Sequence, residues 1–175
     1  LLVERDEHVL TLTMNRPSRY NALSGAMLVR MYDAYCEASA DPEIRCIIVT
    51  GAGGNFCSGA DLKGMAGNAG DEDTGIDIQA RMKADPDIHW KALFRGYRPT
   101  KPIIAAVEGV AIAGGTEILQ AMEIRVAGES ARFGVSEAQI AGARCDESWR
   151  ALLAFQTARA RAMLESGRAL TRELP

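Results

Sequence analysis

The segment KPIIAAVEGVAIAGGTEIL, residues 101–119, is the most informative part of the chain. Its apolar run IIAAV has the composition of a buried β-strand and ends before Gly109. The glycine pair Gly114-Gly115 follows, and Glu117 then enters what the pattern predicts to be a helix. A strand, a glycine-rich turn and a helix in this order leave backbone N–H groups unpaired at the positive end of the helix dipole.

This junction combines two features that a reaction at a thioester needs. Backbone N–H groups can stabilise the negative charge that develops on the thioester oxygen, and a nearby carboxylate can move a proton. Glu117 lies three residues after Gly114, so both features are expected at the same point in space. The segment therefore indicates enolate chemistry.

Composition and charge exclude several classes of protein. The chain has 175 residues, of which 47% are hydrophobic and 25% charged, and its net charge is −3. These values are typical of a globular domain, and no basic run is long enough to indicate nucleic-acid binding. The polar residues are spread too evenly for a membrane span, and LLVERDEHV does not resemble a signal peptide. We therefore expect a cytoplasmic protein.

The cysteines and histidines predict neither a disulfide framework nor a metal site. The four cysteines form no CxxC pair, and the chain has only two histidines. The expected role of the cysteines is that of buried or half-buried thiols. The residues concerned are Cys36, Cys46, Cys57, Cys145, His8 and His89.

Strand and helix signals alternate along the chain, which predicts an α/β fold with mostly parallel strands. Ser24 is the expected N-cap of the first helix, which should end before Asp41-Pro42. The other expected elements are a hairpin in 1–16, a buried strand at 44–50, mixed helical structure in 76–97, strands at 103–107, 124–127 and around Phe133, and an amphipathic helix at 149–164.

A second glycine-rich segment, GAGGNFCSGADLKGM at 51–65, follows the strand at 44–50. It does not match a dinucleotide fingerprint, because Phe56 stands where a glycine is needed. It also fails as a P-loop, because Ala60-Asp61 replaces the Lys-Ser/Thr pair. Small residues before a short helix instead make the N–H of Ala60 a candidate donor. Two turns could then direct two N–H groups at one oxygen.

Four motifs in order and register resemble the crotonase superfamily, and most closely its enoyl-CoA hydratases. They are NRPSRYNALS, FCSGADLKGM, KPIIAAVEGVAIAGGTEIL and RFGVSEA. The resemblance covers residues 1–138 and implies a crotonase-like β-β-α spiral core. It also implies an acyl-CoA thioester substrate, with no cofactor beyond the coenzyme A of that substrate, and a homo-oligomer, either a trimer or a dimer of trimers.

The resemblance assigns roles to individual residues. It implies that the N–H groups of Ala60 and Gly114 form the oxyanion hole, and that the glutamates Glu117 and Glu137 are the catalytic carboxylates. It implies that coenzyme A lies against Ala22, Ala60, Asp61, Leu62, Lys63 and Gly114. No metal ligands are implied.

The resulting hypothesis is a lyase that adds water across the 2,3 double bond of a 2-enoyl-CoA in fatty-acid or lipid catabolism. One alternative is an enoyl-CoA isomerase or another crotonase reaction. An isomerase needs only a carboxylate at the position of Glu137, so Glu117 favours hydration. The other alternative is a non-catalytic CoA-binding assembly subunit. Residues 139–175 do not follow the family pattern, and we expect them to form an atypical helical tail.

Overall fold

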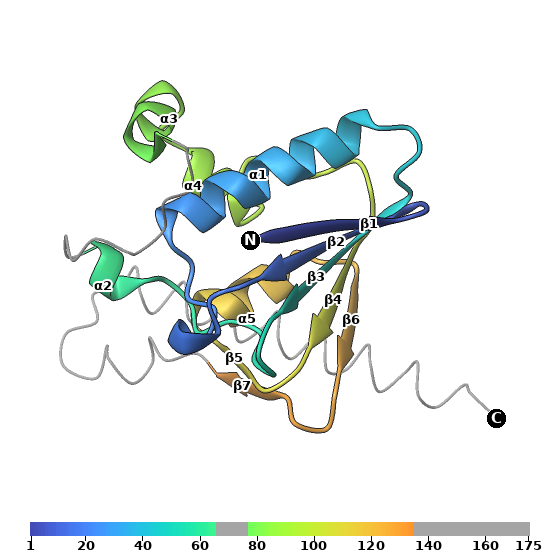
Figure 1. Ribbon diagram of the computed structural model, residues 1–175, viewed down its shortest axis with the longest axis vertical. Coiled ribbons are helices and arrows are strands. Elements are labelled where there is room, and N and C mark those ends of the chain that lie inside the picture. Colours follow the sequence, from blue (N-terminus) through green and yellow to red (C-terminus); the bar gives the residue numbers. More distant parts are fainter. Residues whose placement is uncertain (66–76, 135–175) are drawn as a thin grey trace, which may run out of the picture. The chain divides into compact units, whose positions relative to one another are not determined.

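The computed structural model describes residues 1–65 and 77–134, which form an α/β unit with two sheets (Figure 1). The larger sheet has the strand order β1-β2-β3-β4-β6, and its pairs are parallel except for the antiparallel pair β1–β2. The smaller sheet pairs β5 with β7 in parallel. The elements are β1 (Leu2–Asp6), β2 (Val9–Met14), η1 (Pro17–Arg19), α1 (Gly25–Ala40), β3 (Cys46–Gly51), α2 (Leu62–Met65), α3 (Ile78–Ala84), α4 (Ile88–Ala92), β4 (Ile103–Val107), β5 (Val110–Ile112), α5 (Gly114–Leu119), β6 (Ile124–Ala127) and β7 (Arg132–Gly134).

The predicted hairpin and first helix are confirmed. Burial alternates along β2, whose Leu10, Leu12 and Met14 point into the core. Helix α1 begins after Ser24, whose side-chain oxygen accepts a hydrogen bond of 3.2 Å from the N–H of Met27. Its apolar face, which includes fully buried Met27, Met31 and Tyr35, packs into the same core.

The order of the elements repeats a β-β-α unit. Strand β4 lies in the larger sheet, β5 lies in the smaller sheet, and α5 follows. The preceding unit has β3, then Cys57 bridged to Ala111 of β5, then α2. The next unit begins with β6 and β7. The described residues therefore form the β-β-α spiral that the sequence resemblance implied, and this confirms an α/β fold with mostly parallel pairing.

Strand β5 was not predicted from the sequence, which indicated one strand followed directly by the glycine-rich turn. At Gly109 the chain has a φ of 55° and leaves the larger sheet for the smaller one. A Cβ atom at Gly109 would lie 2.1 Å from the carbonyl oxygen of Gly54, so only glycine fits at this bend. The three residues of β5 become a strand only because Phe56, Cys57 and β7 pair with them.

The remaining predictions within the described residues agree with the structure except at element ends. The strand predicted at 44–50 is β3, and the strand predicted at 124–127 is β6. The mixed helical stretch predicted at 76–97 consists of the two short helices α3 and α4. The helix predicted at 149–164 lies outside the described residues, and the division between 1–138 and 139–175 stays a prediction.

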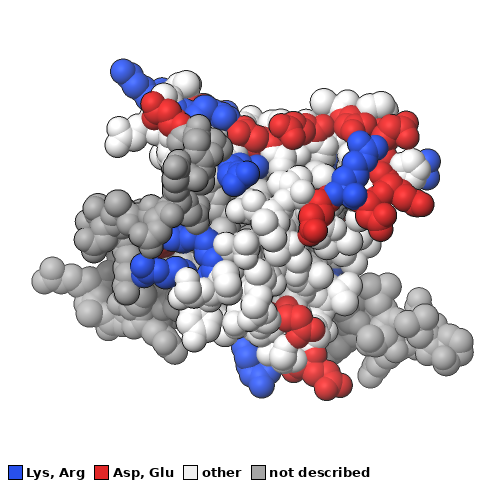
Figure 2. Space-filling view, in the orientation of Figure 1, with Lys and Arg blue, Asp and Glu red and all other residues white. Residues whose placement is uncertain are grey.

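Charged side chains are unevenly distributed over the face shown in Figure 2. They gather along the side where α1 and the β1–β2 hairpin lie, and the surface below is mostly uncharged. Within the described ranges, no helix has the length and apolar character that crossing a membrane would require.

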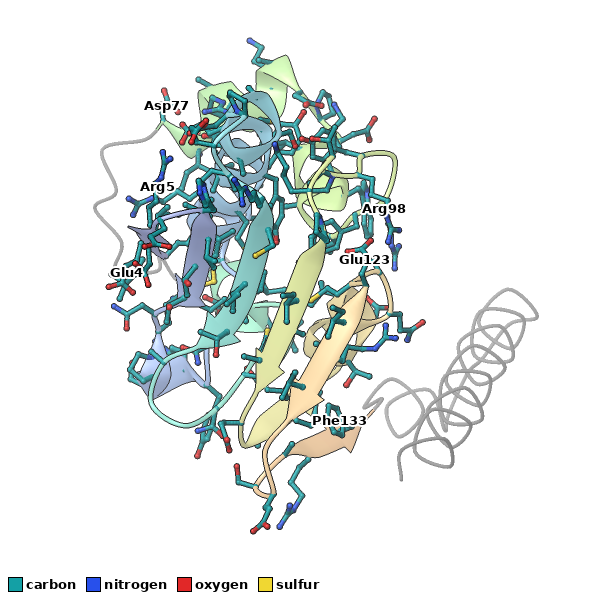
Figure 3. All side chains as sticks on the ribbon, turned by 90° about the vertical axis from the view of Figure 1, so that its right-hand side faces the viewer. Glu4, Arg5, Asp77, Arg98, Glu123 and Phe133 are labelled. Carbon is teal, nitrogen blue, oxygen red and sulfur yellow. The ribbon has the colours of Figure 1, made fainter. Side chains whose placement is uncertain are left out.

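An ion pair between Glu123 and Arg98 fixes the N-terminal ends of β4 and β6, where Figure 3 shows the two side chains close together. Arg98 Nη2 lies 2.6 Å from Glu123 Oε1, and Glu123 Oε2 accepts a hydrogen bond of 2.7 Å from the N–H of Ile103. Burial raises the pKa of Glu123, but the hydrogen bonds from Arg98 and Ile103 outweigh it, and the net effect is a lowered pKa. The charged form of Glu123 therefore stabilises the fold.

Glu123→Gln is expected to lower the free energy of unfolding by about 1 kcal/mol at pH 7, because two charge-assisted hydrogen bonds weaken. Since the folded-state pKa is below the ordinary 4.5, this contribution is present above 4.5 and is lost as the pH falls through the lowered value. Urea unfolding of the parent protein and of Glu123→Gln, at pH 7 and at successive pH values below 4.5, measures the difference in their free energies of unfolding. A difference that stays constant with pH would contradict a role for the charge.

Candidate active site

The two glycine-rich turns meet beside the smaller sheet. The segment Phe56–Cys57 runs along β5, and the carbonyl oxygen of Cys57 accepts a hydrogen bond of 3.0 Å from the N–H of Ile112. This pairing brings the turn after β3 against the turn before α5. A Cβ atom at Gly59 would lie 2.8 Å from the Cβ of Ala113 and 3.0 Å from the nitrogen of Gly114, so the two backbones touch.

This contact brings the backbone of Gly114 close to that of Ala60, the two residues whose N–H groups the sequence predicts as donors. A Cβ atom built on Gly114 would lie 3.8 Å from the nitrogen of Ala60. Within residues 1–65 and 77–134, neither N–H donates a hydrogen bond to another part of the protein. Ala60 is exposed and Gly114 is half-buried. Two such donors can stabilise one oxygen that becomes negatively charged.

The backbone at Ala113 is strained where the second turn enters α5. Its φ of 49° and ψ of −127° lie outside the regions that alanine ordinarily adopts. Hydrogen bonds hold it there, since the N–H of Ala113 donates to Gly134 and its carbonyl oxygen accepts from Thr116 and Glu117. Strain of this kind is concentrated at functional sites, where the surrounding structure enforces it.

A buried ion pair fixes the loop that carries Ala60. Arg16 Nη2 lies 2.8 Å from Asp61 Oδ2, and both side chains are 9% exposed. Burial raises the pKa of the Asp61 carboxyl, but hydrogen bonds from the N–H of Gly64 and from Arg16 outweigh it and lower the pKa. Asp61 therefore acts as a charged anchor for the start of α2.

The ion pair bears on the predicted coenzyme A contacts. The Asp61 carboxylate is engaged by Arg16, and Ala22 is only 8% exposed, with its carbonyl oxygen bound to Arg16 Nη1. Leu62, by contrast, is 70% exposed beside Ala60. The backbone N–H groups of Ala22 and Asp61 are also engaged, by the carbonyl oxygens of Arg19 and Leu23, whereas Leu62 presents an exposed side chain. Lys63 lies in α2.

Asn21 is a buried polar residue that joins the start of η1 to the turn after β3. Its Oδ1 accepts a hydrogen bond of 2.9 Å from the N–H of Arg16, and its Nδ2 donates to the carbonyl oxygens of Ala52 at 2.9 Å and Asn55 at 2.7 Å. Asn21 is 0% exposed and has a φ of 55°, which asparagine tolerates better than most residues. Its amide fixes the glycine-rich turn after β3.

Glu117 lies one helical turn after Gly114, on the same short helix α5. Its side chain is 26% exposed, and its Oε1 lies 3.4 Å from Nη2 of Arg95. The structure thus brings one predicted carboxylate next to one predicted donor. Glu137 lies outside the described residues. In the part of the chain that the structure describes, no group of three or more His, Cys, Asp or Glu side chains could hold a metal ion.

Analysis of the sequence missed the residues that hold this site in place. Arg16, Asn21 and Asn55 fix the loops, and Asn55 Oδ1 also accepts a hydrogen bond of 3.1 Å from the N–H of Val110. Arg95 approaches Glu117 from another element. The only available signal was an asparagine within each of the motifs NRPSRYNALS and GAGGNF, and nothing in the sequence pointed to Arg95.

Comparison with known proteins gives consistent results. A family model described as enoyl-CoA hydratase/isomerase matches residues 4–171. The chain is 52% identical over 138 residues to enoyl-CoA hydratase EchA19 of Mycobacterium tuberculosis, covering 79% of this chain and 50% of that protein. It is 39% identical over 137 residues to the mevalonyl-coenzyme A hydratase SIDH of Beauveria bassiana, covering 76% of this chain and 47% of that protein.

A solved structure extends the likeness to the fold. The crystal structure of an enoyl-CoA hydratase from Mycobacterium tuberculosis superposes with a TM-score of 0.62 at 37% sequence identity, covering 79% of this chain and 52% of that one. The chain therefore spans about half the length of the curated relatives and of the solved structure that it matches.

Asn21→Asp is expected to lower the free energy of unfolding by about 3 kcal/mol, because a buried carboxylate would face the carbonyl oxygens of Ala52 and Asn55. Asn15→Asp makes the same chemical change at an exposed position and is the matched control. Urea unfolding of the three proteins at pH 7 measures both effects. Equal stability of the Asn21 and Asn15 variants would show that the buried amide does not hold the turn.

Proposed function

Because the chain belongs to the enoyl-CoA hydratase/isomerase family, we propose that it adds water across the 2,3 double bond of a 2-enoyl-CoA thioester. The observation that supports this proposal is the contact between the two turns, in which a Cβ atom built on Gly114 would lie 3.8 Å from the nitrogen of Ala60, with Glu117 one helical turn after Gly114. This is the arrangement that a thioester substrate needs.

The proposed reaction requires two proton transfers on one face of the substrate. As the water oxygen forms a bond to C3, one carboxylate accepts a proton from that water, and C2 receives a proton from the other. The π electrons of the double bond pass through C2 to the thioester oxygen as an enolate and return when C2 is protonated. Glu117 is one carboxylate, and we assign the second role to Glu137.

The oxyanion hole lowers the energy of the enolate. Backbone N–H groups are already directed at the oxygen before the reaction begins, so little reorganisation is needed as charge develops. Ala60 and Gly114 supply these donors, and Arg16, Asp61 and Asn21 keep their loop in place. Loss of one such donor typically lowers turnover by about 10²–10³-fold.

The proposal extends to the substrate and the setting of the reaction. Coenzyme A lies along Ala22, Ala60, Asp61, Leu62, Lys63 and Gly114, where Leu62 offers the most exposed side chain beside Ala60. The reaction needs no cofactor beyond the coenzyme A of its substrate. We place it in fatty-acid or lipid catabolism in the cytoplasm. The names of the relatives include hydratases of different acyl-CoA substrates.

Isomerisation is the second candidate, since the description of the family includes it. Moving a double bond requires one carboxylate at the position of Glu137, whereas hydration uses two. Glu117, half-buried and close to Gly114, favours hydration.

We also propose that the protein associates with copies of itself, as a trimer or a dimer of trimers. The support comes from exposed apolar side chains on β6 of the larger sheet and β7 of the smaller sheet. Ile124 is 51% exposed, Val126 is 59% exposed and Phe133, labelled in Figure 3, is 55% exposed. Apolar surface of this kind is typical of an interaction site.

Glu117→Gln and Glu137→Gln are each expected to lower turnover of crotonyl-CoA by about 10²-fold or more, because an amide cannot accept or supply the proton. Loss of the enoyl-thioester absorbance measures turnover, and calorimetry with coenzyme A tests whether binding survives. Glu4→Gln, an exposed change on β1, is the control. Full activity in either active-site variant, with an unchanged circular dichroism spectrum, would exclude the mechanism with two carboxylates.

Gly114→Pro is expected to lower turnover by about 10²-fold or more, because it removes the donor N–H without changing any reacting side chain. Proline suits the first position of a helix, and this N–H makes no hydrogen bond within residues 1–65 and 77–134.

Gly114→Ala is the matched control for this change. It keeps the N–H, and its Cβ would make ordinary contacts of 3.4 Å or more, so most activity should remain. Crystal structures of both variants establish whether the turn is intact. An intact turn with unchanged turnover in Gly114→Pro would show that this N–H is not a donor.

A further inference from the structure

Arg95 is a cation that the structure places beside Glu117. Its Nη2 lies 3.4 Å from Glu117 Oε1, and it reaches that carboxylate from the segment after α4, 22 residues away in the sequence. The Arg95 side chain is 48% exposed, and an exposed ion pair of this kind contributes little to the stability of a fold. Its place beside a proposed catalytic group suggests a different role.

The guanidinium of Arg95 also contacts the ring of Trp90 in α4. The Arg95 Cζ atom lies 4.6 Å from the centre of the Trp90 ring, within the range of a cation–π interaction. The N–H of Arg95 also donates a hydrogen bond of 2.8 Å to the carbonyl oxygen of Trp90. Backbone and side chain of the same tryptophan therefore determine where the arginine lies.

The segment that carries Arg95 is anchored to α1 on both sides. Phe94 packs with its ring centre 5.0 Å from that of buried Tyr35, and the Tyr97 ring lies 5.1 Å from that of Tyr32. Phe94 has a φ of 62°, in the left-handed region that a bulky residue rarely adopts. The aromatic contacts hold this strained turn, and the turn directs Arg95 toward Glu117.

A fixed cation matters because a glutamate side chain rotates about three torsions. Proton transfer at C2 or C3 needs the carboxylate within about 0.5 Å of its working position, and a displacement of 1 Å can cost about 10²-fold in rate. The Arg95 guanidinium carries a positive charge, and its Nη2 contacts Oε1 of Glu117. Such a contact limits the positions that the carboxylate can take.

We propose that Arg95, stacked on Trp90, is a positioning residue that orients the Glu117 carboxylate for proton transfer, an inference that rests on the proposed hydration. Arg95 acts through Glu117, so its contribution should appear in turnover and should vanish when Glu117 can no longer exchange a proton.

The test uses Arg95→Met, which removes the charge and keeps much of the length of the side chain. We expect kcat for crotonyl-CoA to fall about tenfold, with KM changed less than about twofold. Arg95→Lys keeps the charge and should recover part of the loss. Trp90→Leu leaves the charges of Arg95 and Glu117 in place but removes the ring that holds the guanidinium. We expect it to lower kcat as well.

A double-mutant cycle separates positioning from a structural role. In a Glu117→Gln background, Arg95→Met should cause no further loss of residual turnover, because the group that it orients is already inactive. Arg5→Met is the matched control, since it breaks another arginine–carboxylate ion pair, in which Arg5 Nη1 lies 3.0 Å from Asp41 Oδ2. This control should leave kcat unchanged in both backgrounds.

The outcomes distinguish the inference from the proposed function. An active protein whose kcat is unchanged in Arg95→Met overturns the inference alone, as does an equal loss in both backgrounds. A folded protein that hydrates no enoyl-CoA overturns the proposed function and the inference together. If Arg95→Met lowers kcat in the parent background but not in the Glu117→Gln background, and the melting temperature is unchanged, the result supports the positioning role.

Discussion

Direct contact between two stretches of backbone is the constraint on which the site depends. Gly59 touches Ala113 and Gly114, and a Cβ atom at Gly115 would lie 2.3 Å from the carbonyl oxygen of Cys57. Any side chain at Gly59 or Gly115 would separate the two turns, and with them the N–H groups that we propose as the oxyanion hole. The smaller sheet holds this contact, because β5 pairs with the segment Phe56–Cys57.

Polar groups buried beside the contact keep the loops from relaxing. The Asn21 amide joins the start of η1 to the turn after β3, and Arg16 holds Asp61 at the start of α2. These interactions replace water on groups that would otherwise be costly to bury. They fix one arrangement of the turns, and in the proposed mechanism this arrangement holds the donors for the negative oxygen in place before a substrate binds.

Local signals in the sequence predicted α1 and the first hairpin, because Ser24 caps the helix and alternation marks β2. The four motifs predicted the pairing of the two turns. Strand β5 could not be predicted, because its three residues depend on partners distant in sequence. The contact of Arg95 with Glu117 could not be predicted either. It depends on a left-handed turn at Phe94, and a bulky residue gives no turn signal in the sequence.

The most direct measurement of the central claim is the carbonyl ¹³C resonance of a labelled enoyl-CoA bound to the Glu117→Gln variant, in which turnover is slow. Two backbone donors polarise the thioester carbonyl, so the account expects the resonance to move downfield on binding, and to move much less when Gly114→Pro is added. A resonance that stays at its free-solution position in a bound complex would contradict the convergence of Ala60 and Gly114 on the thioester oxygen.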